Sequence, residues 1–161
     1  MKIFVDTNLF VYAVDALSPF HQAAEAFFDS IPAQNLEPRI SGQILVEFYS
    51  AVTKRAKRPL NPAVAARETL RIMQAPEFVR LPIDDVAMKL TLGLASKHEL
   101  RGVEVFDAQI VGMMLSHGVE SLYTVNVRDF DRFEEIHVIN PLEPPDPDPP
   151  RVAEARRRYR R

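Results

Sequence analysis

Short apolar segments alternate with helical patterns along most of this chain. Segments rich in β-branched and aromatic residues predict strands at residues 3–5, 38–41, 78–81, 122–125 and 136–139. Apolar residues at helical spacing lie between them and predict helices over about residues 18–28, 43–57, 62–74, 84–98 and 104–117. Strands that alternate with helices are typical of a parallel sheet covered by helices. The sequence therefore predicts an α/β fold.

An aspartate, Asp6, directly follows the first predicted strand. Thr7 or Asn8 is then placed to cap the helix that comes next. In open α/β sheets, ligands bind outside the carboxyl ends of the strands. We therefore regard Asp6 as a candidate for catalysis or metal binding.

The composition argues against several other classes of protein. The chain has 161 residues, which suggests one domain, and its 47% hydrophobic content argues against disorder. It has no cysteine, hence no disulfide framework and no thiolate metal site. No apolar run approaches the ~20 residues of a membrane span, and an acid at position 6 comes too early for a signal peptide. We expect a cytoplasmic protein without a membrane segment.

The C-terminal end differs in composition from the rest of the chain. Residues 141–150 contain six prolines, which end the fold, so we expect a domain over 1–140 and an extension over 141–161. Residues 151–161 hold six arginines and one glutamate, a charge of +5, whereas the other 150 residues carry −7. Two interpretations stay open: the arginine-rich tail binds a polyanion such as RNA, or it is a solvated chain end.

A second candidate acid, Asp107, lies among apolar residues of the helix predicted over 104–117. On a helical wheel it falls within the arc of Val103, Phe106, Ile110, Val111 and Met114. Burying an unpaired carboxylate costs on the order of several kcal/mol, so a cation, a metal or a hydrogen-bond network must offset the cost. The alternative is a buried aspartate that caps nearby backbone.

Two more acids follow turns of the predicted sheet. Glu47 borders the apolar face of a helix, just after a strand-to-helix turn at Ser41, and Asp129 follows the strand over 122–125. An ordinary Asx turn with a helix cap also explains Asp129 and the nearby Asn126. A boundary position on the helix also explains Glu47.

Together the four acids are more informative than any one of them, because these positions can converge on one rim of a parallel sheet. Carboxylates cannot stay ionised side by side without a counter-charge, and Mg²⁺ or Mn²⁺ supplies one through oxygen ligands. Such a metal binds phosphate and lowers the pKa of a bound water. The pattern therefore favours phosphodiester hydrolysis.

A basic cluster ends the helix predicted over 43–57, and its members are Lys54, Arg55, Lys57 and Arg58. These side chains either contact an RNA backbone or complement the helix dipole. The four histidines are scattered without metal-ligand spacing.

In these motifs the chain resembles the PIN-domain family, specifically the VapC-type toxin ribonucleases of toxin–antitoxin pairs. The matching segments are 5–8 (VDTN), 41–47 (SGQILVE), 106–110 (FDAQI) and 124–130 (TVNVRDF), in matching order over about residues 1–140. The resemblance implies a three-layer α/β/α fold with a central parallel sheet. It also implies a Mg²⁺-dependent endoribonuclease that acts on single-stranded RNA, a homodimer, and inhibition by a small antitoxin.

The resemblance also implies roles for particular residues. Three core acids of the family, which bind the metal, match Asp6, Glu47 and Asp107. Many relatives have the fourth acid where this chain has Asn126, so Asp129 is the available fourth carboxylate and Asn126 binds water or backbone. The residues that resemble partners orienting the carboxylates or the attacking water are Thr7, Asn8 and Thr124.

Three hypotheses about function follow. The leading one is a metal-dependent endoribonuclease, the toxin of a toxin–antitoxin pair. The second is a non-catalytic RNA- or protein-binding module on the same scaffold, suggested by Asn126 and the basic tail. The third, an aspartyl-phosphate phosphatase built on Asp6, is weaker because such enzymes usually have a second acid where this chain has Asn8.

Overall fold

Five strands form one parallel sheet in the computed structural model, which describes residues 1–142. The strands are β1 (Lys2–Val5), β2 (Glu37–Ser41), β3 (Val79–Leu81), β4 (Ser121–Tyr123) and β5 (His137–Ile139), in the order β3-β2-β1-β4-β5. The predicted parallel sheet is confirmed. The arginine-rich tail and most of the proline-rich segment lie outside the described residues, so the predicted extension over 141–161 stays a prediction.

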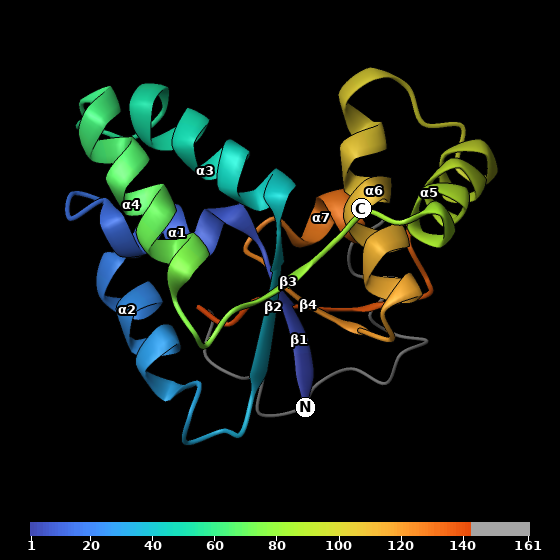
Figure 1. Ribbon diagram of the computed structural model, residues 1–161, viewed down its shortest axis with the longest axis horizontal. Coiled ribbons are helices and arrows are strands. Elements are labelled where there is room, and N and C mark those ends of the chain that lie inside the picture. Colours follow the sequence, from blue (N-terminus) through green and yellow to red (C-terminus); the bar gives the residue numbers. More distant parts are fainter. Residues whose placement is uncertain (143–161) are drawn as a thin grey trace.

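Helices cover both faces of the sheet (Figure 1). On one side lie α1 (Thr7–Val14), α2 (His21–Ser30), α3 (Gly42–Lys54) and α4 (Pro62–Gln74). On the other side lie α5 (Asp85–Lys97) and α6 (Val105–Ser116). A 3-10 turn, η1 (Gly102–Glu104), precedes α6, and a short helix, α7 (Val127–Phe130), joins β4 to β5. The expected three-layer arrangement is confirmed. Within residues 1–142, none of the helices has the length and hydrophobicity that crossing a membrane requires.

The central strand β1 places the first candidate acid. Its residues Ile3, Phe4 and Val5 are fully buried. The chain leaves β1 to form β2 and β3 on one side, and then crosses over to form β4 on the other. The carboxyl ends of β1 and β4 therefore flank the point where the strand order reverses, which is where ligands bind in such sheets.

The first two helices begin differently from the prediction. Asp6 itself caps α1, because its Oδ1 accepts the N–H of Thr7 at 2.6 Å. Neither Thr7 nor Asn8 is the cap, since both already belong to the helix. The helix predicted from residue 18 begins only at His21, because Ser18 Oγ accepts the N–H two residues later in a local turn.

The apolar arc predicted for α6 is only partly correct. Ile110, Val111 and Met114 are buried, but Val103 is 79% exposed and Phe106 is 52% exposed. Buried residues lie all around the middle of α6, because this helix packs against α5 as well as against the core. Its first turn, which holds Asp107, instead faces a pocket at the edge of the sheet.

Candidate active site

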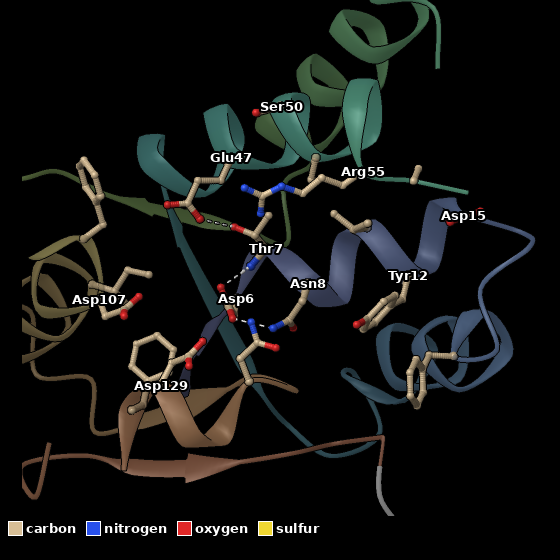
Figure 2. Close-up of a pocket in the computed structure, with 18 of the residues that line it drawn as sticks. Asp6, Thr7, Asn8, Tyr12, Asp15, Glu47, Ser50, Arg55, Asp107 and Asp129 are labelled. Atoms are coloured by element: carbon tan, nitrogen blue, oxygen red, sulfur yellow. Dashed lines mark hydrogen bonds between the residues drawn. The ribbon is translucent and has the colours of Figure 1, made fainter. Parts of the chain in front are cut away.

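A pocket of about 860 Å³ lies at the carboxyl edge of the sheet. All four predicted acids line it, although they come from different elements: Asp6 follows β1, Glu47 is on α3, Asp107 is on α6 and Asp129 is on α7 (Figure 2). The expectation that these acids converge on one rim of the sheet is met by the geometry.

Asp6 is the most constrained of the four acids. It is only 6% exposed. Its Oδ2 accepts hydrogen bonds from Asn8 Nδ2 at 2.8 Å and from the Thr124 hydroxyl at 2.5 Å. With the N–H of Thr7 on Oδ1, three donors hold the carboxylate in a single orientation.

Thr124 joins the ends of the two central strands. Its hydroxyl donates to Asp6 and accepts from Asn8 Nδ2 at 2.9 Å and from the backbone N–H of Asn126 at 3.0 Å. Asn8 Oδ1 in turn accepts the N–H of Val125 at 3.3 Å. The contacts expected of Asn8 and Thr124 are therefore present. Asn126 contributes its backbone here, and the role predicted for its side chain stays a prediction.

Glu47 is held from two sides. Its Oε2 accepts the Thr7 hydroxyl at 3.0 Å, and its Oε1 accepts Gln43 Nε2 at 2.7 Å. The Gln43 amide also donates to the backbone carbonyl of Phe106 at 3.3 Å, which connects α3 to the start of α6. Gln43 was not among the residues predicted from the sequence. Its position four residues before Glu47 was the available indication, because such pairs share one face of a helix.

The carboxylates of Asp107 and Asp129 are less constrained by hydrogen bonds than those of Asp6 and Glu47. Within residues 1–142, neither side chain accepts a hydrogen bond, and a cation, Arg132, lines the pocket with them. Arg132 pairs with Glu104 through Nη1 and Oε1 at 3.0 Å. This pair was also missed, since nothing in the sequence relates residues 104 and 132.

The two aspartates Asp6 and Asp107 do not behave as ordinary surface acids. Burial, opposed by the Thr124 and Thr7 hydrogen bonds and reinforced by Glu47 and Asp129, raises the pKa of Asp6 to about 6. Burial and the negative charges of the other three acids raise the pKa of Asp107 to about 6, with a smaller opposing effect from Arg132. Both shifts have the direction expected when carboxylates are crowded together with too little compensating charge.

Comparison with known proteins identifies the family. The model of the PIN domain matches residues 3–136, most of the chain. The chain belongs to the PIN domain family.

The individual relatives of this PIN domain share at most a quarter of its sequence in the matches described next. Ribonuclease VapC48 of Mycobacterium tuberculosis is 25% identical over 139 residues, which cover 85% of this chain and 95% of the relative. The crystal structure of VapC20 from Mycobacterium tuberculosis, a toxin that cleaves the sarcin-ricin loop, matches with a TM-score of 0.64 and 19% identity over 79% of this chain and 92% of that one. A toxin–antitoxin complex from Klebsiella pneumoniae matches with a TM-score of 0.59 and 19% identity over 86% and 97% of the two chains. These two structures share the fold.

The acids of this PIN domain have the chemistry of a hard-cation site. Carboxylate oxygens are the ligands that Mg²⁺ and Mn²⁺ prefer. Burial, with a further contribution from the neighbouring acids, raises the pKa of both Asp6 and Asp107. No three acidic, histidine or cysteine side chains among residues 1–142 are close enough to enclose a metal by themselves. Mg²⁺ usually keeps several waters and takes one or two carboxylates directly, so the residues present fit such an ion.

Proposed function

We propose that this PIN domain is a metal-dependent endoribonuclease that hydrolyses RNA phosphodiester bonds, and that it is the toxin of a toxin–antitoxin pair. The observation that carries the proposal is the convergence of four carboxylates on one pocket at the carboxyl edge of the sheet. The similarity to Ribonuclease VapC48 supports RNA as the substrate.

Asp6, Glu47 and Asp107 are the residues proposed to hold Mg²⁺ or Mn²⁺, one or two of them as direct ligands and the rest through coordinated waters, and Asp129 completes the site or positions water. When bound, the divalent cation neutralises the acids, binds a phosphate oxygen and lowers the pKa of a coordinated water. The protein itself orients the carboxylates through hydrogen bonds. Thr7 connects two of the acids, since its N–H bonds Asp6 and its hydroxyl bonds Glu47.

Cleavage of a single-stranded RNA tests this proposal. We expect cleavage with Mg²⁺ or Mn²⁺, none with EDTA, and a loss of at least a hundredfold in Asp6→Asn and Asp107→Asn. Asp131→Asn is the matched control, because Asp131 is exposed, lies two residues from Asp129 and does not line the pocket. Circular dichroism checks that each variant is folded. Parental rates in both site variants would contradict the mechanism.

A non-catalytic binding module is the second candidate. It is favoured by one observation: no three of the acids among residues 1–142 enclose a metal site by themselves. The cleavage assay separates the two candidates, because a binding module retains RNA without cutting it in either metal.

We also propose a homodimer, a cytoplasmic location and a small antitoxin as partner. The support is the family resemblance and the structural likeness to a toxin–antitoxin complex. Exposed apolar side chains near the pocket, Val46 at 71% and Phe106 at 52%, offer surface for such contacts. Light scattering of the purified chain, alone and with the product of a neighbouring small gene, measures both assemblies.

A further inference from the structure

The pocket is much larger than a metal site requires. An ion with six waters fills roughly 180 Å³, at about 30 Å³ per water, whereas the cavity measures about 860 Å³. The remaining space extends past the C-terminal end of α3 and along the loop between α1 and α2. The residues that line this part include Tyr12, Ser18, Phe20, Ser50, Arg55 and Lys57. The cavity therefore has room for a ligand that extends away from the acids.

A cation, Arg55, is among the residues that line the pocket. Arg55 follows the last residue of α3, is exposed, and forms no ion pair with any carboxylate among residues 1–142. Figure 2 shows its side chain pointing back along α3 toward Glu47 and Thr7. A role at the helix dipole requires the charge near the last carbonyls of the helix, so this orientation favours the other role, contact with a phosphate.

Two aromatic rings form the opposite part of the wall. Tyr12 on α1 and Phe20, just before α2, have ring centroids 5.0 Å apart with planes at 42°. Phe20 is nevertheless 41% exposed. A ring that served only to hold the loop would gain more by full burial, whereas an exposed ring at a pocket wall offers a face on which a base can stack.

Two hydrogen bonds tie together the backbone segments that carry the rings and the cation. Asp15 Oδ2, at the end of α1, accepts the backbone N–H of Lys57 at 3.1 Å, which ties the loop to the turn that follows Arg55. His21 Nδ1 lies 3.0 Å from the carbonyl of Tyr12, which ties the start of α2 to α1.

We propose that this side of the pocket is a nucleotide subsite, in which Arg55 binds a phosphate of the RNA strand and Phe20, backed by Tyr12, stacks on a base next to the cleaved bond. The subsite rests on the proposed ribonuclease function, since it deepens the same site. Because a base must leave its partner to stack on a protein ring, the subsite selects single-stranded RNA.

Binding without metal tests the subsite separately from cleavage. A labelled single-stranded oligoribonucleotide and an abasic strand of equal length and charge are titrated with the full chain in EDTA, and anisotropy is recorded. Repulsion by the acids weakens binding equally for all variants that keep them. We expect Arg55→Gln to weaken binding of both strands about fivefold and to lower the salt slope by about 0.7, the value for one lost phosphate contact on a single strand. Arg58→Gln is the matched control, since it removes the same charge from the same cluster outside the pocket.

The abasic strand separates stacking from a structural role. We expect the parent to bind the abasic strand at least fivefold more weakly, and Phe20→Leu to bind both strands alike. If Phe20→Leu weakens both strands equally, or if Arg55→Gln matches Arg58→Gln, the subsite is wrong. A parent that cleaves RNA while failing these tests keeps the proposed function, whereas base-dependent binding without cleavage in Mg²⁺ keeps the subsite and overturns the ribonuclease.

Discussion

The partly buried carboxylate of Asp107 lowers the stability of the folded protein. In the folded chain its pKa is raised to about 6 from an ordinary 3.8. The folded state therefore holds its proton more tightly than the unfolded state. The resulting cost to stability is absent below about pH 4, grows as the pH rises, and is complete above about pH 6.

We therefore expect Asp107→Asn to stabilise the metal-free protein at pH 7.5. A shift of two pKa units corresponds to about 3 kcal/mol, and partial exposure of Asp107 reduces the expected gain to about 1–2 kcal/mol. At pH 4 the gain vanishes. Urea unfolding in EDTA at both pH values measures it, with Asp131→Asn, at an exposed aspartate outside the pocket, as the control. A variant that is less stable than the parent at pH 7.5 would show that the carboxylate is not crowded.

At the scale of elements, the contact between α5 and α6 depends on a missing side chain. A Cβ at Gly112 of α6 would lie 2.5 Å from Thr91 Oγ1, 2.7 Å from the Thr91 backbone nitrogen and 2.9 Å from the Ala87 carbonyl of α5. Two of these atoms are backbone, so the helices themselves must move apart to admit a methyl group. Since α6 carries Asp107, this movement also displaces part of the site.

We expect Gly112→Ala to destabilise the protein by about 1–3 kcal/mol, the usual cost of overpacking, and to lower RNA cleavage. Gly93→Ala is the matched control, because a Cβ at this position in α5 meets nothing within 4 Å. It should stabilise the chain by about 0.5–1 kcal/mol through helix propensity. Thermal unfolding compares the two variants. Equal stability of both would mean that α5 and α6 pack less closely than described.

The sequence predicted the elements better than their ends. The spacing of apolar residues predicted the strands of the sheet and the longer helices. For example, α4 spans residues 62–74 as predicted. The helix α7 was not predicted, because its four residues are too few to show a helical period. The cap of α1 was misassigned because Asp6, as the last residue of an extended segment, can both end a strand and accept the first free N–H of a helix.

At the scale of the whole molecule, the acids could be predicted from the sequence, whereas several of the side chains that connect the elements around them could not. Asp6 and Asp107 stand out in the sequence because each interrupts an apolar pattern. Arg132 does not, and neither does the contact of Gln43 with Phe106, since only the packing of distant segments brings Arg132 near Glu104 and Gln43 near Phe106. No periodicity encodes such contacts.

We propose that four acids from distant segments act together as one cation site. Calorimetric titration of Mn²⁺ into the full chain at pH 7.5 measures this directly, because Mn²⁺ takes the same oxygen ligands as Mg²⁺. We predict saturable binding to the parent and to Asp131→Asn, and binding weakened at least tenfold in both Asp6→Asn and Asp107→Asn. Unchanged Mn²⁺ affinity in these two variants would show that Asp6 and Asp107 do not hold the cation.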